Sequence, residues 1–255
     1  MKKTFIEHFL LKLSGIFTML FIWIVLSFTK WADEGPTRMW FAKIDEVGTA
    51  IVDIFATKII HILSSFEDIF IASIIVLLLG VIFGLAIGFF ENLYRSLKWP
   101  IDFWRSIPPI IVISVLLNLD GRDELFWRIW LVMFGALPIM IMQIADAVNN
   151  SSKKRMLIFE ALKTKKMFII NNIIIYEILA SLFSTTRTIL SFAIIIIIVS
   201  EMVFSPQHGI GEQILHFQTA SEIQYVYAYA IILGLIGLLL NGIIRLFEKK
   251  YVYWQ

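Results

Sequence analysis

Charged residues in a very apolar chain are the first candidates for chemistry. A polar segment at residues 151–166, SSKKRMLIFEALKTKK, lies between two long apolar stretches and holds six Lys or Arg residues and one Glu. Such a segment can present Glu160 and Ala161 to a soluble partner. Four further ionisable residues fall in or beside apolar stretches, where an unpaired charge is costly and often marks a pathway for a polar solute: Asp102, Arg105, Asp146 and Arg187. Arg187 has two interpretations. It is either a helix-end residue that reaches the cytoplasmic interface, or a pathway residue paired with Asp102 or Asp146.

The common signatures of catalysis are absent from the sequence. It has no Walker-type phosphate loop, no HExxH, no GxSxG and no Cys. The four His residues are scattered, apart from a separated pair in one predicted outer loop, His208 and His216. We therefore expect no catalytic residue, no metal site and no cofactor on this chain. A membrane-embedded enzyme remains an alternative, and it would need Asp102, Arg105, Asp146 and Arg187 to converge on one cavity.

The composition indicates whether this chain is surrounded by water or by lipid. Of its 255 residues, 59% are hydrophobic and only 16% are charged. A water-soluble globule of this composition would have too little polar surface to cover itself, so we expect a protein embedded in membrane lipid. The net charge of +2 is too small to indicate a nucleic-acid surface, and no nucleic-acid partner is expected.

Apolar runs of about 20 residues predict helices that cross the hydrocarbon. The sequence is therefore expected to fold as an all-α polytopic membrane protein with about six transmembrane helices. The six predicted segments are residues 13–30, 68–90, 101–118, 128–148, 172–200 and 225–246. A shorter amphipathic segment, 47–63, places Ile51, Ile54 and Ile62 at helical spacing and is expected to lie along the membrane surface.

The N-terminal segment can be read in two ways. Lys2 and Lys3 precede an apolar run, as in a secretory signal. The apolar core is longer than the roughly 7 to 15 residues of a signal core, and no small-residue cleavage site follows it. We therefore expect a first transmembrane helix.

The distribution of positive charge predicts the orientation, because cytoplasmic loops collect Lys and Arg. Alternate loops carry the basic residues Lys2, Lys3, Lys12, Arg95, Lys98, the segment 151–166, Arg245, Lys249 and Lys250. The opposite loops have mixed or acidic charge, with Asp120, Arg122, Asp123, Glu124, Glu201, Glu212 and Glu222. Both termini are therefore expected to be cytoplasmic.

Glycine and proline positions predict close packing and interrupted helices. Gly80, Gly84 and Gly88 recur every four residues and form one face along which a second helix can approach closely. Pro108 and Pro109 remove two backbone donors from the third apolar segment, which predicts a bend. Pro138 is expected to do the same in the fourth. Bent inner helices suit a gated pathway.

Four stretches give the chain a specific resemblance. WPIDFWRSIPPI, FGALPIMI, FEALKT and SEMVFSPQHGIGEQI, the last followed by a long apolar C-terminal segment, occur in this order from about residue 65 onward. In this order they resemble the membrane subunits of bacterial binding-protein-dependent ABC importers, in the branch of nitrate, sulfonate, taurine and bicarbonate permeases. The resemblance implies a type I ABC importer permease in the bacterial inner membrane.

The resemblance also implies partners and site residues. A second permease copy or paralogue would complete the pathway, two cytoplasmic ATPase subunits would bind ATP and Mg, and an external solute-binding protein and membrane lipids would contact the complex. The ATPase-coupling residues would be Glu160, Ala161, Leu162, Lys163 and Thr164. The expected pathway residues are Arg105, Pro108, Pro109, Asp146 and Arg187.

Departures from the family pattern fall in the coupling loop, at about residues 149–171, and shortly after it. Leu162 stands where a second Ala is usual, Lys165 and Lys166 replace a region with Gly, and Tyr176 stands where Pro is expected. These departures favour the alternative of a non-transport scaffold or lipid-handling subunit. The expected domain organisation is a first helix with an external amphipathic segment over 1–64 and a permease core over 65–255.

Overall fold

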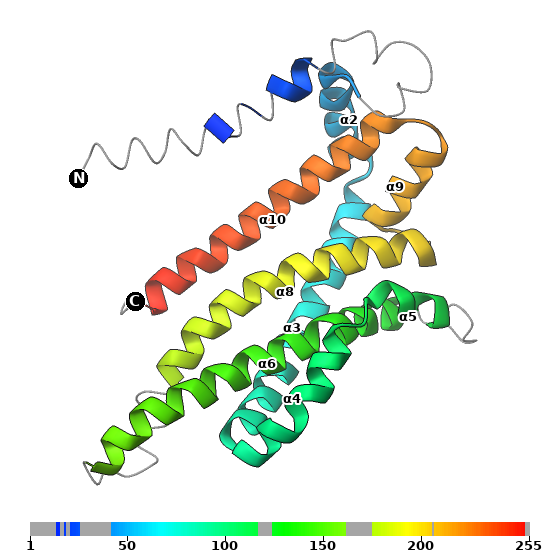
Figure 1. The fold of residues 1–255 in the computed structure, drawn as a ribbon. Coiled ribbons are helices and arrows are strands. Elements are labelled where there is room, and N and C mark those ends of the chain that lie inside the picture. The colour runs from blue at the N-terminus through cyan, green and yellow to red at the C-terminus, as the bar shows by residue number, and fades with distance from the viewer. Residues whose placement is uncertain are drawn as a thin grey trace, which may run out of the picture. The chain divides into compact units, whose positions relative to one another are not determined.

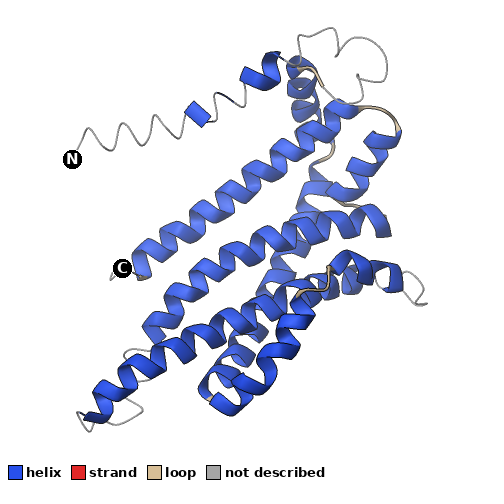
Figure 2. Cartoon of the chain, in the orientation of Figure 1, coloured by secondary structure: helices blue, strands red, loops and turns tan. Residues whose placement is uncertain are grey.

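The structure is a computed structural model that describes residues 14–15, 18, 21–25, 42–116, 124–161, 175–205 and 207–252, with only the backbone of 124, 150–161 and 175–177. The helices, labelled in Figure 1, are α2 (Ile44–Thr57), α3 (Ile59–Phe89), α4 (Glu91–Arg105), α5 (Pro109–Leu116), α6 (Glu124–Ala161), α8 (Ile175–Phe204), α9 (Ile210–Thr219) and α10 (Ile223–Tyr251). The described residues contain helices and loops and no strand (Figure 2), so the predicted all-α fold is confirmed.

Four of these helices are long and apolar enough to cross a membrane. They are α3, α6 over Leu125–Asn149, α8 over Ile178–Phe204, and α10, and they match the predicted segments 68–90, 128–148, 172–200 and 225–246. In the predicted first segment, residues 14–15, 18 and 21–25 are helical, and its other residues lie outside the described part of the chain.

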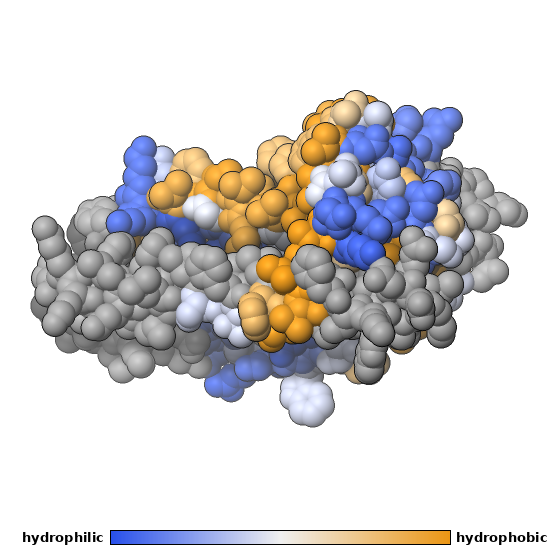
Figure 3. Space-filling model, turned by 90° about the horizontal axis from the view of Figure 1, so that it is seen from above, coloured by the Kyte–Doolittle hydropathy of each residue, from blue (hydrophilic) through white to orange (hydrophobic). Residues whose placement is uncertain are grey.

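Large apolar side chains remain exposed along these helices. Leu78 of α3 is 60% exposed, and Leu238 of α10 is 71% exposed. Figure 3 shows hydrophobic residues at the surface beside hydrophilic ones. Only 6% of the most apolar window of α10 is buried inside the chain, so this helix presents its apolar surface to lipid or to another protein.

The predicted third segment, 101–118, is not one continuous helix. The chain breaks at Ser106–Pro108, between α4 and the short α5. Ser106 and Ile107 close the end of α4 with backbone hydrogen bonds to Phe103 (3.1 Å) and Trp104 (3.0 Å). Pro108 and Pro109 have no N–H to continue the ladder, which is why the helix ends here. By contrast, α6 runs through Pro138 without a break.

The predicted amphipathic segment 47–63 divides between two helices. Its first part forms the end of α2, up to Thr57, and the part after Lys58 forms the start of α3. α2 buries Val47, Ala50 and Ile54, whereas Phe55 on the predicted apolar face is 51% exposed. The segment is therefore amphipathic, as predicted, but it is not a single helix.

The described residues fall into two compact units. One contains α2, the end of α9 from Ile214 and the start of α10 up to Leu233; the other contains residues 60–213 and 234–252. In the first unit, Tyr225 donates a hydrogen bond to Asp53 Oδ2 (3.0 Å) and stacks on Phe217 with ring centroids 4.1 Å apart. The units are defined by internal contacts and do not test the predicted boundary between an N-terminal part (1–64) and a permease core (65–255). That boundary stays a prediction.

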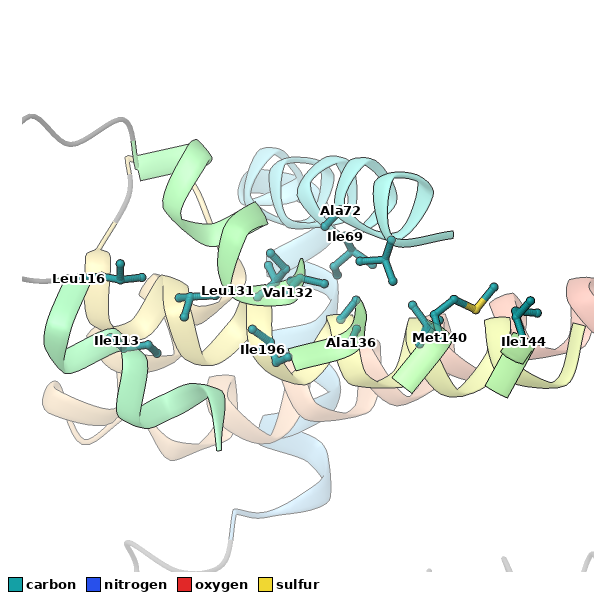
Figure 4. Packing of buried hydrophobic residues seen from close by; sticks show 14 of the residues in the cluster. Ile69, Ala72, Ile113, Leu116, Leu131, Val132, Ala136, Met140, Ile144 and Ile196 are labelled. Carbon is teal, nitrogen blue, oxygen red and sulfur yellow. The ribbon is translucent and has the colours of Figure 1, made fainter. Parts of the chain in front are cut away.

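The core of the larger unit is built around α6. Leu131, Val132, Ala136, Met140 and Ile144 of this helix are buried against α3, α5 and α8 (Figure 4). The glycine face of α3 makes this packing possible. A Cβ at Gly84 would lie 2.7 Å from Ile144 Cβ, and one at Gly88 would lie 2.7 Å from Val148 Cβ. The predicted close packing is confirmed, and its partner is α6 of the same chain.

Candidate functional site

The expected coupling segment begins on a helix that is continuous with a membrane span. α6 leaves the apolar stretch at Asn149 and continues to Ala161, so Glu160 and Ala161 are its last two described residues. At 1.5 Å per residue this extension is about 18 Å long. No Gly or Pro interrupts the chain between Pro138 and Ala161. Leu162, Lys163 and Thr164 lie outside the described residues.

Asp146, an expected pathway residue, holds α6 against α4. The Tyr94 hydroxyl donates a hydrogen bond to Asp146 Oδ1 (2.6 Å) and accepts one from Lys98 Nζ (3.1 Å). Burial, and then the neighbouring Asp146 carboxylate, raise the pKa of Tyr94. The predicted pairing of Asp146 with Arg187 is therefore wrong: this carboxylate is satisfied by a tyrosine.

Arg105 and the double proline lie at the junction of α4 and α5. Arg105 Nε is 3.2 Å from Asp102 Oδ1, one turn back on the same helix, and its side chain is about half exposed. Pro109 begins α5, where its missing N–H costs no hydrogen bond. A Cβ at Gly135 would lie 2.6 Å from Pro109 Cγ, so the proline packs directly on α6. Two of the stretches that carry the resemblance, WPIDFWRSIPPI and FGALPIMI, therefore contact each other.

Arg187 is paired across helices with a residue that the sequence did not suggest. Its guanidinium forms a short ion pair with Glu248 of α10. The predicted alternatives, Asp102 and Asp146, have the partners described above. Both members of the pair are partly buried, as expected for charges that lie within or near the apolar part of the helices.

A buried ion pair escaped the sequence reasoning. Arg128 of α6 lies 2.7 Å (Nη2) and 2.9 Å (Nε) from Asp68 Oδ2 of α3, and both side chains are less than a tenth exposed. Arg128 Nη1 is buried without a hydrogen-bond partner. One signal in the sequence could have revealed the pair. Asp68 and Arg128 stand at the starts of two predicted spans, 68–90 and 128–148, that run in the same direction, so their opposite charges lie at a similar depth.

Glu201 is fully buried, although the sequence placed it near a membrane interface. Its carboxylate accepts hydrogen bonds from Ser65 of α3 (2.6 Å) and from the backbone N–H of Gly211 (2.7 Å). The Ser65 hydroxyl also accepts a hydrogen bond from the N–H of Ile210 (2.8 Å). This network fastens the start of α9 to α3 and α8.

The two glycines in Gly209-Ile210-Gly211 are required by this close approach. A Cβ at Gly209 would lie 2.8 Å from the Glu201 carboxyl carbon, and one at Gly211 would overlap the carbonyl oxygen of Ile198. His61 Nδ1 accepts a hydrogen bond from the N–H of Gly209 (3.2 Å). This turn therefore packs against two membrane helices, α3 and α8.

The four charged residues that a membrane-embedded enzyme would need have separate partners. Asp102, Arg105, Asp146 and Arg187 would have to face one cavity, but Arg105 pairs with Asp102, Asp146 binds Tyr94 and Arg187 pairs with Glu248. Among the described residues, no group of three or more His, Cys, Asp or Glu side chains could hold a metal ion.

Comparison with known proteins identifies the family. Residues 77–253, more than half of the chain, match the family described as "Binding-protein-dependent transport system inner membrane component". Three similar proteins have transport names. A protein named as an ABC transporter permease in Methanocaldococcus jannaschii is 27% identical over 176 residues, which are 68% of this chain and 64% of that protein. A protein named as an aliphatic sulfonates transport permease in Bacillus subtilis is 24% identical over 177 residues, which are 69% and 63%.

The third similar protein is named as an ABC transporter permease in Brucella abortus. It is 22% identical over 212 residues, which are 82% of this chain and 79% of the relative. The chain thus spans less than two thirds of the length of the first two relatives.

Proposed function

Because the chain belongs to the family of inner-membrane components of binding-protein-dependent transport systems, we propose that it is a permease subunit of an ATP-driven importer. It forms part of the translocation pathway for a small solute and works by alternating access. ATP hydrolysis, with its Mg, takes place on separate cytoplasmic ATPase subunits, so this chain is not itself an enzyme.

The observation that carries the proposal is the continuity of α6. One helix carries the buried Arg128 near one end, the apolar core in its middle and Glu160 near its other end. A displacement of Glu160 by a soluble partner is therefore transmitted along a single rigid element to the packed core. A permease needs such a connection, because its energy arrives from another chain.

The proposed assembly follows the family. One of two ATPase subunits contacts residues 160–164, a second permease copy or paralogue faces this chain across the pathway, and an external solute-binding protein delivers the solute. The complex lies in the bacterial cytoplasmic membrane with both termini inside, as the basic loops favour. Binding-protein docking outside and nucleotide closure inside are the two inputs that bias the inward and outward states.

The proposed solute is a small anion such as a sulfonate, nitrate or bicarbonate. The name of the Bacillus subtilis relative supports a sulfonate. Arg105 and Arg187 are compatible with an anion. Arg105, Pro108, Pro109, Asp146 and Arg187 remain the proposed pathway residues, and Glu160, Ala161, Leu162, Lys163 and Thr164 the proposed coupling residues.

Reversal of one charge tests the coupling. The full complex with its ATPase is reconstituted in proteoliposomes, and ATP-driven uptake is compared for the native chain and Glu160→Lys. An interfacial charge reversal that costs more than about 1.4 kcal/mol lowers uptake at least tenfold. Glu91→Lys, a charge reversal on α4 outside the coupling segment, serves as the matched control and is expected to retain uptake.

Two results would contradict this assignment. Unchanged uptake by Glu160→Lys would remove Glu160 from the coupling path. A purified complex in which no ATPase contacts this face would instead support the alternative of a non-transport scaffold, which the Lys165 and Lys166 departures favour.

A further inference from the structure

A polar cavity lies between α8 and α10 in the larger unit. Its volume is about 340 Å³, within the range of small-molecule sites. The polar and small residues that line it are Arg187, Thr188 and Ser191 of α8, and Asn241, Gly242 and Arg245 of α10. Of these residues, only Arg187 has a proposed role, in the pathway, and no motif assigns a ligand to the cavity.

The charge of the cavity is positive. Arg187 is partly neutralised by Glu248, but Arg245 has no ion-pair or hydrogen-bond partner among the described residues. No acidic residue lines the cavity. With Glu248 counted, two cations face one anion, so the cavity can accept one further negative charge. Cations in or near an apolar span are stabilised when an anion pairs with them.

Hydrogen-bonding capacity adds to the charge. Thr188 and Asn241 line the cavity, and no hydrogen bond within the described residues occupies their side chains. The Ser191 hydroxyl donates to the Arg187 carbonyl (3.1 Å) and keeps its lone pairs for another donor. Guanidinium groups from two helices, together with hydroxyl groups and an amide, suit a group that accepts several hydrogen bonds at once.

The glycines explain why the space is open at this level. A Cβ at Gly237 would lie 3.9 Å from Ile194 Cδ1, so α8 and α10 are in contact there. A Cβ at Gly242 would meet no atom within 4 Å. The missing side chain at Gly242 therefore leaves room for a ligand in the cavity that Gly242 and Arg245 line.

We propose that this cavity binds a tetrahedral oxyanion, of the sulfonate or phosphate class, between Arg187 and Arg245. The oxyanion accepts hydrogen bonds from both guanidinium groups and competes with Glu248 for Arg187. It can come from a transported solute or from the headgroup of an anionic lipid. Only the identification with a transported solute rests on the proposed function, because the cavity is a property of this chain alone.

Binding of radiolabelled sulfate to the purified full chain tests the site. The chain is placed in nanodiscs of neutral phosphatidylcholine at constant ionic strength. Arg245→Gln removes a charged hydrogen-bond donor and is expected to weaken binding about 10-fold to 100-fold. Glu248→Gln removes the competing anion and is expected to strengthen binding up to about fivefold. A variant that merely loosened the fold would not bind sulfate more tightly.

A matched glycine pair tests the location. Gly242→Leu fills the cavity without a change of charge and is expected to weaken sulfate binding at least as much as Arg245→Gln. Gly234→Leu, two turns earlier on α10, is the control because a Cβ at Gly234 also meets no atom within 4 Å and Gly234 does not line the cavity. Absence of saturable sulfate binding, or equal binding by Gly242→Leu and the native chain, would overturn the proposal.

Nanodiscs that contain phosphatidylglycerol separate the two sources. If the lipid headgroup is the occupant, sulfate binding to the native chain falls in these nanodiscs; if a solute is the occupant, it is unchanged. The proposed function is tested apart from the site. If the chain binds sulfate but the full complex takes up no anion with ATP, the site is supported and the importer proposal is refuted. If the complex takes up an anion but neither Arg245→Gln nor Gly242→Leu changes sulfate binding, the importer proposal is supported and the site is refuted.

Discussion

The packing of α3 on α6 gives a prediction that can be worked out from distances. Gly84→Ala places a methyl group 2.7 Å from Ile144 Cβ and 2.9 Å from the carbonyl oxygen of Ile141. Ordinary van der Waals contact begins at 3.4 Å. The Ile141 oxygen belongs to the backbone of α6 and cannot rotate away, so the two helices have to separate.

Separation has a cost along the whole glycine face. A gap of 0.5 to 1 Å forfeits about a quarter to a half of the dispersion energy of each contact. The contacts at Gly80 with Met140 and at Gly88 with Val148 are therefore weakened as well. Overpacking of this kind costs about 1 to 3 kcal/mol.

A second alanine variant isolates that cost. Replacing Gly by Ala also changes the intrinsic stability of the helix, by about 1 kcal/mol in water and by a different amount inside a membrane. A control variant has to remove this term. Gly234→Ala receives the same gain on α10 but meets no atom within 4 Å. The difference between the two variants in free energy of unfolding is therefore the packing cost alone, about 1 to 3 kcal/mol.

The assay is unfolding by sodium dodecyl sulfate in mixed micelles, followed by fluorescence of the chain's tryptophans. We expect Gly84→Ala to unfold at a lower detergent fraction than the native chain and Gly234→Ala at the same fraction or a higher one. A Gly84→Ala variant as stable as Gly234→Ala would show that α3 and α6 are not in close contact, and the packing argument would fail.

Three further predictions concern stability. Asp68→Asn leaves Arg128 buried without its counter-charge and is expected to cost about 3 to 5 kcal/mol, whereas the double variant Asp68→Leu with Arg128→Met should recover most of this in the same unfolding assay. The pKa of Tyr94 is raised in the folded state, so the neutral Tyr94 hydroxyl stabilises the fold. This stabilisation is complete below the unfolded-state pKa of about 10 and is lost as the pH rises through the folded-state pKa. The native chain should therefore lose stability in alkali more steeply than Tyr94→Phe. Ser221 has a left-handed backbone conformation with φ 62°, so Ser221→Gly should raise the free energy of unfolding by up to about 1 kcal/mol. A lower free energy of unfolding would show that contacts of the Ser221 side chain outweigh its backbone strain.

Local signals in the sequence were sufficient for much of the fold. The apolar runs identified α3, α6, α8 and α10, because a bilayer span needs a continuous apolar stretch wherever it packs. The spacing of Gly80, Gly84 and Gly88 predicted a close helix contact, and the double proline predicted the interruption before α5. Each of these features depends on residues only a few positions apart.

The partners of the charged residues could not be predicted in the same way. Asp68 and Arg128 are 60 positions apart, and Arg187 and Glu248 are 61 apart. Which carboxylate meets which guanidinium depends on the rotation and tilt of two helices, and these are set by the packing of apolar side chains. Pairing with Asp102 or Asp146 was therefore one of two interpretations of Arg187, and the structure pairs it with Glu248 instead.

Glu201 shows why burial can be misjudged from sequence. A carboxylate late in an apolar run is expected at the interface, because an isolated charge in hydrocarbon is very costly. Its cost falls when donors are fixed around it, and Glu201 has two donors, the Ser65 hydroxyl and the backbone N–H of Gly211. The N–H of Ile210 donates to Ser65 in turn, and Ile210 and Gly211 begin α9. Their approach to Glu201 is possible only because Gly209 and Gly211 have no side chain.

The position of α6 connects these observations. Gly84 packs against its middle, Pro109 against Gly135, Asp68 against one end, and Tyr94 against Asp146 nearer the other. A helix held by so many close contacts cannot bend locally without breaking several of them, because packed interiors resist small displacements. Motion imposed at Glu160 is therefore expected to move α6 together with the elements fixed to it, and this supports the proposal that the coupling role belongs to this helix rather than to α10.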